Sequence, residues 1–257
     1  AIKKDLPDLE TIVLDSYYGV TVEARKGEPY GQMYGRLYAR DSQGNIVVGS
    51  NGRPLNGSSN PVGVVGNYNA DWTGGLGNRL SYGAFTLNVL IDTQQGGSVF
   101  SMTNRYGRRA GVLESSLPGR ELYDADGVPL PPSEGGGLIV PGVKVVAGDT
   151  LPNDIRVAAH DYHRGLSGIA EEFTYDASFV KLREIRLGYQ VPQRFTDRMG
   201  VSQMSLAFIG RNLFLWTDVP NIDPETAFNP GNAQGYEWGQ FPSARSFGFS
   251  VSLSPNF

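Results

Sequence analysis

The segment from Thr217 to Ser243 concentrates side chains that could hold a ligand. Its rings and carboxylates are Trp238, Tyr236, Phe228, Phe241, Asp223 and Glu225. Aromatic rings stack on sugar faces or clamp peptide side chains, and carboxylates accept hydrogen bonds from hydroxyl and amide groups. We therefore predict that these residues contact a ligand. The alternative is that they fold the segment itself, because a long connection needs its own packing. For the Asp223-Pro224-Glu225 motif, this shaping role is our first interpretation.

Two groups of residues have side chains that could bind a metal ion. His160, Asp161 and His163 could hold a transition metal, but such close spacing brings the ligands together only in particular backbone conformations. Asp124 and Asp126 begin like a calcium loop, yet the acidic residue that should end the loop is missing. Hydrogen-bonded loops explain both groups better. The sequence thus predicts no metal site, and it gives no sign of a cofactor.

No arrangement of residues supports catalysis. The chain has no G-x-S-x-G motif, no His paired with a nucleophile on a strand end, and no glycine loop that cradles phosphate before a helix. We therefore predict that it is not an enzyme. Arg105, Arg108 and Arg109 could meet acidic saccharides, although such a cluster is more often a solvated surface. The net charge of -4 disfavours nucleic acid as a partner, since binding phosphates requires a basic surface.

The elements that must position these side chains are β-strands, and the last one is the clearest. Its apolar residues occupy every other position: Phe247, Phe249, Val251, Leu253 and Phe257. The residues between them are small and polar: Ser246, Gly248, Ser250, Ser252 and Ser254. A period of two gives a strand one apolar face and one polar face. We interpret this strand as part of a membrane barrel, with lipid outside and a wet lumen inside.

The same alternation recurs upstream. It is clear over Ile185 to Val191, Phe85 to Asp92 and Trp72 to Tyr82, and weaker over Val201 to Trp216. The strands over 72–82 and 85–92 should meet in a tight hairpin, because Gly83 supplies the backbone angle that such a turn needs. The 34 glycines and 16 prolines fit a turn-rich all-β chain. No stretch approaches the run of about 20 apolar residues that a spanning helix needs.

Aromatic spacing gives a geometric argument for the barrel. Rings ten residues apart form three pairs: Trp72 and Tyr82, Phe179 and Tyr189, and Phe247 and Phe257. Ten steps along a tilted strand climb roughly 23 Å, close to the height of about 25 Å of the apolar band of an outer-membrane barrel. We predict that these residues form the aromatic girdles at the two edges of the membrane.

The connections between strands alternate in length. The Gly83 hairpin and the 192–200 connection are short, whereas the segments at about 27–70, 93–178 and 217–243 are long. Outer-membrane barrels have short periplasmic turns and long outside loops, so the long segments are predicted to be extracellular. A weaker strand within Thr11 to Arg25 brings the number of strands to about six, fewer than the 8 of the smallest closed barrels. We infer that the chain is a portion of a larger barrel.

At family level, the sequence resembles the C-terminal part of the SusC/RagA-like TonB-dependent transporters. The motifs that carry the resemblance are weak singly but specific in their order: Gly31 to Gly35, Tyr38 to Asp41, Asp71 to Gly75, Phe179 to Tyr189, Gly210 to Phe214, Asp223 to Glu225, and Arg245 to Phe257. The resemblance covers nearly the whole chain except the first thirty residues and the middle of the 93–178 segment.

The resemblance implies an architecture and a set of partners. Members of the family are antiparallel transmembrane barrels of 22 strands with an N-terminal plug, and they lie in the outer membrane of Gram-negative bacteria such as Bacteroidetes. They import glycans or peptides with a SusD-like surface lipoprotein as a lid, driven by the TonB complex. This chain would supply the last strands and several lid-facing loops, and its plug and TonB box would lie elsewhere. The competing hypothesis is a secreted, soluble β-sandwich that acts as a carbohydrate-binding or adhesin module.

Overall fold

The computed structural model describes residues 10–58, 60–226, 231 and 234–255, and most of its regular structure is antiparallel β-sheet. The chain divides into two compact units, which are described separately. The sheet unit comprises Ala70–Gly97, Asp176–Thr226 and Phe241–Phe257, and the core unit comprises Ala1–Asn69, Ser98–Tyr175 and Ala227–Gln240. In the described part of the chain, no helix has the length and apolar character that crossing a membrane would require.

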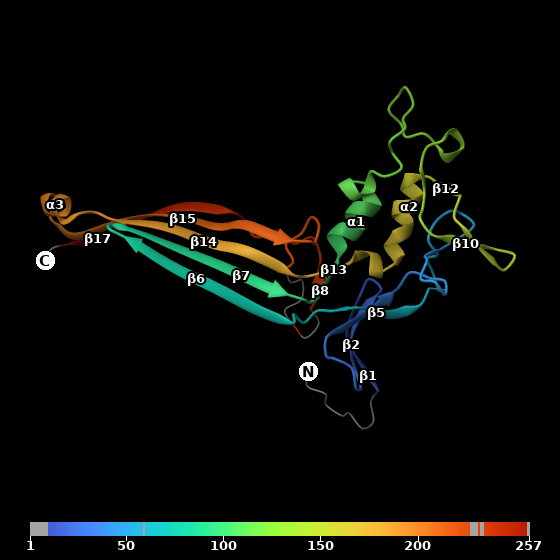
Figure 1. The fold of residues 1–257 in the computed structure, drawn as a ribbon, viewed down its shortest axis with the longest axis horizontal. Helices are drawn as coiled ribbons and strands as arrows, with labels where there is room; N and C mark the ends of the chain where they lie inside the picture. Colours follow the sequence, from blue (N-terminus) through green and yellow to red (C-terminus); the bar gives the residue numbers. More distant parts are fainter. Residues whose placement is uncertain (1–9, 59, 227–230, 232–233, 256–257) are drawn as a thin grey trace. The chain divides into compact units, whose positions relative to one another are not determined.

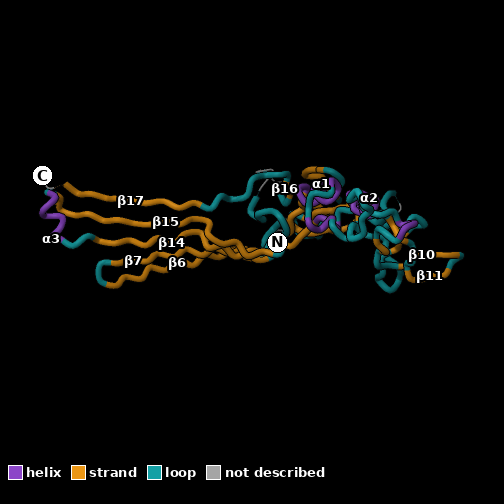
Figure 2. The backbone as a smooth tube through the Cα atoms, turned by 90° about the horizontal axis from the view of Figure 1, so that it is seen from above, coloured by secondary structure: helices purple, strands orange, loops and turns teal. Residues whose placement is uncertain are grey.

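The sheet unit is built on five antiparallel strands in the order β17-β15-β14-β7-β6 (Figures 1 and 2). Their bounds are β6 Trp72–Tyr82, β7 Phe85–Gln95, β14 Phe179–Gln190, β15 Val201–Thr217 and β17 Ser246–Pro255. A two-residue turn joins β6 to β7, and Gly83 adopts the positive φ of 56° that the turn requires. The short helix α3, Gln193–Thr196, lies in the 192–200 connection. The predicted strands and the hairpin are confirmed.

Cross-strand pairing gives this sheet two different faces. One row of paired residues on the apolar face consists of Tyr82, Phe85, Tyr189, Leu206 and Val251. The neighbouring row, on the opposite face, consists of Ser81, Thr86, Gly188, Ala207 and Ser250. The apolar face is open rather than packed, since Tyr82 is 89% and Phe249 85% exposed.

A β-bulge in β14 interrupts the alternation. Leu182 pairs with Ile91 and Glu184 with Leu90, so Arg183 is an extra residue without a partner on β7. A bulge of one residue reverses the face of every side chain beyond it. Phe179 therefore lies on the polar face, where it is 4% exposed.

The bulge overturns one predicted girdle pair. Phe179 and Tyr189 lie on opposite faces, so the prediction that they share a face is wrong. Trp72 and Tyr82 do share the apolar face, because β6 is uninterrupted over its whole length. Phe247 also lies on this face, and Phe257 is outside the described residues.

The core unit folds around a small sheet and two helices. Its main sheet has the order β1-β2-β3-β5, with bounds Thr11–Tyr17, Val20–Arg25, Gln32–Arg36 and Val62–Asn67. The helices α1, Met102–Ala110, and α2, Ala159–Gly165, pack against each other (Figure 1). The segment from Thr11 to Arg25 therefore forms a hairpin of this unit, where the sequence predicted one strand of the barrel.

Three short sheets complete the fold. They are β11-β10-β4 (Asp149–Pro152, Val143–Val146, Val47–Val48), β12-β9 (Arg156–Val157, Leu138–Ile139) and β13-β8-β16 (Thr174–Asp176, Ser98–Ser101, Tyr236–Glu237). The hydrophobic core of the core unit joins residues distant in sequence: Val20, Val22, Met33, Tyr38, Phe100, Met102, Leu166, Ile169, Ala170, Phe173 and Tyr236. Segments predicted as long loops thus contribute to a packed core.

Candidate functional site

Three of the predicted contact residues meet at one recess of the sheet unit. Asp223, Glu225 and Phe241 line it together with Thr226 and Ser243, and its volume is about 290 Å³. The Phe241 ring is 95% exposed, so it offers an open apolar surface beside two carboxylates. A recess of this kind could hold a polar ligand that also carries an apolar group.

The floor of the recess is an ion pair. The Lys181 ammonium donates to both oxygens of the Asp223 carboxylate, at 2.6 and 2.7 Å, and to Glu225. Only 3% of the Lys181 side chain and 5% of the Asp223 side chain are exposed. Asp223 also accepts the backbone N–H of Glu225 at 3.1 Å, and its carbonyl accepts the N–H of Thr226 at 2.9 Å. These contacts fit the loop-shaping interpretation of the Asp223-Pro224-Glu225 motif.

The bulge in β14 supplies a second cation. Arg183 donates through two nitrogens to the same carboxylate oxygen of Asp92 on β7, at 2.7 and 3.1 Å, and it also pairs with Glu225. Lys181, Arg183 and Glu184 consequently all project from the polar face within four consecutive positions. An unbroken strand would have sent one of them to the other side.

The two carboxylates of the recess remain ionised under ordinary conditions. Burial by itself raises the pKa of Asp223, but hydrogen bonds from Lys181, the Glu225 N–H and Ser243 outweigh it, so its pKa lies below the usual value. Burial also raises the pKa of Glu225, and Arg183 and Lys181 together lower it below its ordinary value. The recess therefore presents a fixed, already compensated set of charges beside the exposed Phe241 ring.

Trp238 belongs to a separate cluster of rings in the core unit. Its indole stacks on Tyr18 at 4.8 Å between ring centroids and meets Tyr17 and Tyr106 edge-on at 5.3 and 5.6 Å. Tyr18 and Tyr106 are 48% and 40% exposed. Tyr18 holds a positive φ of 48°, a conformation that costs energy for a residue with a bulky side chain. The cluster is thus an exposed aromatic surface whose rings are held in place by each other.

A buried glutamate positions this aromatic cluster. Glu237 is fully buried and accepts hydrogen bonds from Ser101 Oγ at 2.7 Å, Thr103 Oγ1 at 2.5 Å and the Thr103 N–H at 3.1 Å. These donors surround the N-terminus of α1, where a carboxylate is stabilised by the helix dipole. Because Glu237 directly precedes Trp238, the anchoring of the carboxylate fixes the backbone from which the indole projects.

Tyr236 does not form part of an accessible site. It is 1% exposed, its ring packs in the hydrophobic core, and its hydroxyl donates to the carbonyl of Val20 at 3.2 Å. The prediction of direct ligand contact is wrong for Tyr236, because the strand β16 turns this ring inward. Phe228 lies outside the described residues.

The histidines of α2 have structural roles. His163 is buried, with its Nδ1 accepting from Arg108 Nε and its Nε2 donating to the carbonyl of Pro118, each at 3.2 Å. Both ring nitrogens are thus engaged, and His160 is paired only with Asp161 beside it. No group of His, Cys, Asp and Glu in the described residues has the arrangement of a metal site.

Two arginines of the cluster, Arg105 and Arg108, and the acidic turn are also explained by internal contacts. Arg105 donates to the carbonyls of Ser167 and Tyr18, at 2.6 and 2.9 Å, and Arg108 pairs with Glu172. Asp124 closes its own turn by accepting the N–H groups of Asp126 and Val128, at 3.0 and 2.8 Å.

Sequence reasoning missed several residues of these sites. Lys181 and Arg183 were noted only as part of a family motif, although two cations two residues apart near a strand end could have suggested partners for Asp223 and Glu225. Tyr18 and Glu237 gave no comparable signal, because their roles depend on contacts between segments far apart in the chain.

The chain resembles known proteins both in sequence and in fold. No protein-family model matches the sequence. The chain is similar to two proteins of Formosa agariphila: TonB-dependent receptor P3, 26% identical over 96% of this chain, and TonB-dependent receptor P26, 27% identical over 84%. The chain spans 25% and 20% of the lengths of these relatives.

Solved structures of the RagAB system are similar to this chain in fold. The structure of the RagAB peptide transporter matches with a TM-score of 0.57 and 15% identity, covering 95% of this chain and 25% of the matched one. The RagAB peptide importer in its open-open state gives a TM-score of 0.57 at 14% identity over 98% of this chain. The arrangement of strands and segments is thus that of about a quarter of such a transporter chain.

Proposed function

We propose that this chain is a SusC/RagA-like TonB-dependent receptor segment and forms part of the wall of an outer-membrane importer. The observation that carries the proposal is the pair of unlike faces on the sheet unit. Large apolar rings stand exposed on one face, and small or charged side chains stand on the other. Hydrocarbon covers the first face and the lumen wets the second.

The β-sandwich alternative demands a different environment for these rings. In a sandwich the apolar faces of two sheets pack together and exclude water. Tyr82 and Phe249 instead remain more than four-fifths exposed. The relatives are receptors and importers by name, which favours transport over catalysis and over a soluble binding module.

Chain connectivity supports the proposed orientation. The Gly83 hairpin and the α3 connection join strands at one end of the sheet, whereas the long segments 98–175 and 227–240 are inserted after strands that end at the opposite end. Outer-membrane barrels have short periplasmic turns, which supports an extracellular position for the long segments. There, the Trp238 cluster and the Asp223, Glu225 and Phe241 recess would meet the substrate or a SusD-like lipoprotein, while other parts of the polypeptide contact the TonB complex.

The imported substrate is proposed to be a glycan or an oligopeptide. Exposed tyrosine and tryptophan rings suit sugar faces and peptide side chains equally. A transport assay separates the two: cells carrying the full-length receptor are given labelled oligopeptides or labelled oligosaccharides, with and without Tyr18→Ala and Phe241→Ala. Loss of uptake for one class, with unchanged receptor abundance, identifies the substrate. Normal uptake of both classes by cells lacking the receptor would contradict the proposed function.

The membrane assignment has its own test. Cysteines introduced at Phe249 and Ser250 of the full-length receptor carry nitroxide labels in lipid vesicles. We expect the label at position 249 to collide mainly with dissolved oxygen and the label at 250 mainly with a water-soluble nickel complex. Equal behaviour of the two labels would show that the two faces see the same solvent, contrary to the proposal.

A further inference from the structure

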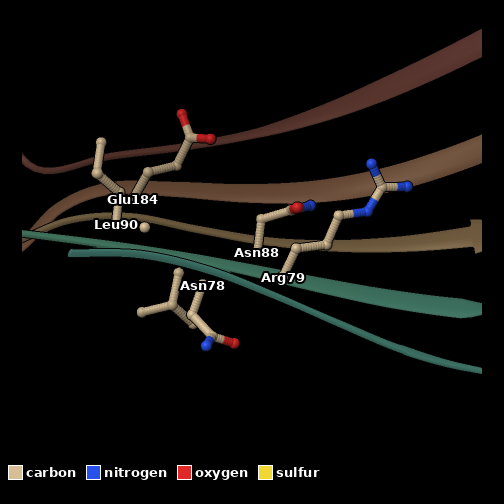
Figure 3. Close-up of a pocket in the computed structure, with 7 residues that line it drawn as sticks. Asn78, Arg79, Asn88, Leu90 and Glu184 are labelled. Carbon is tan, nitrogen blue, oxygen red and sulfur yellow. The ribbon is translucent and has the colours of Figure 1, made fainter.

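One face of the sheet unit carries all the charge of its strands. Figure 3 shows Arg79 and Glu184 on one side of the strands and Asn78 on the other. The cross-strand register and the ion pairs place the remaining charged residues on the side of Arg79: Asp92, Lys181, Arg183, Arg186 and Arg211. The apolar face of β6, β7, β14, β15 and β17 therefore has no charged residue.

One arginine reaches the apolar face from just outside these strands. Arg245 directly precedes β17, and its guanidinium lies over the ring of Phe214 on β15, 5.5 Å from the ring centroid. Phe214 pairs with Leu182 on the apolar face and stacks on Trp216, with 5.7 Å between the ring centroids. Arg245 is exposed, and within the described part of the chain no carboxylate forms an ion pair with it. A positive charge thus stands at the border of an otherwise uncharged surface.

Two tryptophans indicate the depth of this charge in a membrane. Trp216 belongs to a row of paired residues that also contains Thr93 and Gly74. The ring of Trp72 leans over the same row, since a Cβ on Gly74 would lie 3.1 Å from it. Both indoles are 55% exposed. Tryptophan is enriched where the hydrocarbon of a membrane meets the headgroups, so this row indicates an edge of the apolar band.

The length of the strands agrees with this edge. Eight residues of β6 separate Gly74 from Tyr82 at the Gly83 hairpin, about 26 Å along the strand. A strand tilted by about 40° then climbs roughly 20 Å, comparable to the height of about 25 Å of the apolar band. Under the proposed function the Gly83 hairpin is at the periplasmic end. Arg245 therefore lies at the level of the headgroups of the outer leaflet.

The surroundings of Arg245 favour a lipid phosphate as its anion. The headgroup layer supplies phosphates, and a guanidinium donates two parallel N–H groups to phosphate oxygens. The Phe214 ring attracts the cation through its π face and restricts the positions that the long side chain takes. Close to hydrocarbon the effective dielectric constant is lower than in bulk water, which strengthens the pair. Acyl chains of the same lipid would pack against Phe214 and Trp216, an apolar contact that free phosphate lacks.

We propose that Arg245, Phe214 and Trp216 bind the phosphate-bearing headgroup of a lipid in the outer leaflet. The guanidinium holds the phosphate, and the two rings contact the adjoining part of the acyl chains. The inference rests on the proposed function, because it requires lipid on the apolar face and the long segments outside the cell. It goes beyond that function by assigning a specific lipid site to this surface.

A pair of lipids that differ only in the phosphate tests the proposal. The full-length receptor, stripped of lipid in a nonionic detergent, is titrated with monophosphoryl lipid A or with the same glycolipid after dephosphorylation. Native mass spectrometry measures the bound fraction of each. We expect the phosphorylated lipid to bind at least about tenfold more tightly than its counterpart, because the charge-assisted hydrogen bonds to the phosphate are lost with it.

Substitutions of Arg245 should act on this preference alone. Arg245→Gln should abolish the preference and leave binding of the dephosphorylated lipid unchanged, whereas Arg245→Lys, which keeps the charge without the paired donors, should retain part of it. Arg194→Gln is the matched control, since Arg194 of α3 also lies over an exposed ring, that of Phe195, at 4.7 Å. We expect this variant to bind both lipids like the unmodified receptor. Heat-modified mobility on gels verifies that each variant is folded.

Three results would overturn the proposal with the proposed function intact. The first is equal binding of the two lipids by the unmodified receptor. The second is a preference for the phosphorylated lipid that survives Arg245→Gln or falls equally with Arg194→Gln. The third is displacement of the lipid by millimolar inorganic phosphate, which would assign Arg245 to a free anion. A label at position 249 that reports water instead of lipid would show that the membrane assignment itself is wrong, and the lipid site would fall with it.

Discussion

The two units place their aromatic side chains in opposite environments. In the core unit, Phe100, Phe173 and Tyr236 are each 1% exposed and belong to one hydrophobic core. In the sheet unit, Tyr82 and Phe249 stand 89% and 85% exposed on a sheet with no second layer of its own. The core unit is therefore stabilised by its own packing. The sheet unit relies on its backbone hydrogen bonds and on a surrounding medium in which apolar side chains are stable.

The largest effect is expected from an ion pair that is buried although it belongs to the open sheet unit. Lys181 is a buried charge in the sheet unit, so Lys181→Met leaves Asp223 without its cation and Glu225 with Arg183 alone. Removing one partner of a buried pair costs about 3–5 kcal/mol. We expect lower stability to urea in lipid vesicles and faster proteolysis within residues 218–226 of the full-length receptor.

Lys144 provides the matched control. Its pair with Asp154 is exposed, with 74% of the Asp154 side chain accessible, and Lys144→Met should cost less than about 1 kcal/mol. Equal losses for the Lys181 and Lys144 variants would show that burial does not separate the two pairs.

The next effect concerns the two faces of β17. Phe249→Arg should destabilise the membrane-embedded receptor by about 2–4 kcal/mol if the residue lies near the bilayer midplane, because the charge enters hydrocarbon. Ser250→Arg, one residue along, places the same charge in the lumen and should be tolerated. Heat-modified mobility on gels and urea titration in vesicles measure both variants. A tolerated Phe249→Arg would place this face in water.

A smaller effect should follow from weakening the anchor under Trp238. Glu237→Gln keeps the shape of the side chain but removes the negative charge to which Ser101 and Thr103 donate hydrogen bonds. The expected loss of stability is about 1–3 kcal/mol. We expect this loss in the core unit, seen as increased hydrogen exchange of α1 with little change in β17. Glu134→Gln, at an exposed position, serves as control. Equal exchange in both variants would show that Glu237 anchors nothing.

The smallest effect is expected from acidification, which should destabilise the core unit at a higher pH than the sheet unit. Burial, followed by the charges of Arg108 and Arg120, lowers the pKa of His163 below its ordinary 6.5, so its contribution to stability is present above pH 6.5 and is lost as the pH falls from there toward the folded pKa. Because the pKa values of Asp223 and Glu225 are lowered from their ordinary 3.8 and 4.5, these carboxyl groups keep their full contribution to stability above about pH 4.5.

Between pH 6.5 and 4.5, only the core unit should therefore loosen through these groups. Hydrogen exchange of α2 and of the 218–226 segment measures the two responses. His163→Asn should remove the first response without affecting the second. Simultaneous loosening of both segments at pH 5.5 would contradict this assignment.

The sequence predicted the sheet unit well because each strand obeys one simple periodicity. Lipid on one side and a wet lumen on the other impose a period of two that can be read from a single strand. The bounds of β6 and the hairpin at Gly83 follow directly from it. Phe179 was misplaced because a bulge depends on pairing with two neighbouring strands, which no single strand records.

The core unit was poorly predicted for the opposite reason. Its core joins Val22, Phe100 and Tyr236, which belong to three segments far apart in sequence, and none of these segments is long enough to show a clear period. Tyr236 points into the core, and Glu237 fixes the backbone before Trp238. Both features depend on the pairing of β16 with β8. For Asp223, the motif indicated a shaping role, but its partner Lys181 emerged only from the folded register.

The extra residue in β14 makes the length of this strand as important as its composition. Deletion of Arg183 would remove the extra residue and leave Lys181 and Phe179 on the polar face, in register with Asp92 and Gln94. If Arg183 instead stayed in a straight strand without the bulge, Lys181 and Phe179 would turn toward the hydrocarbon, and an ammonium group would stand among acyl chains. Homologous strands should therefore either keep the extra residue in a bulge or lack it altogether.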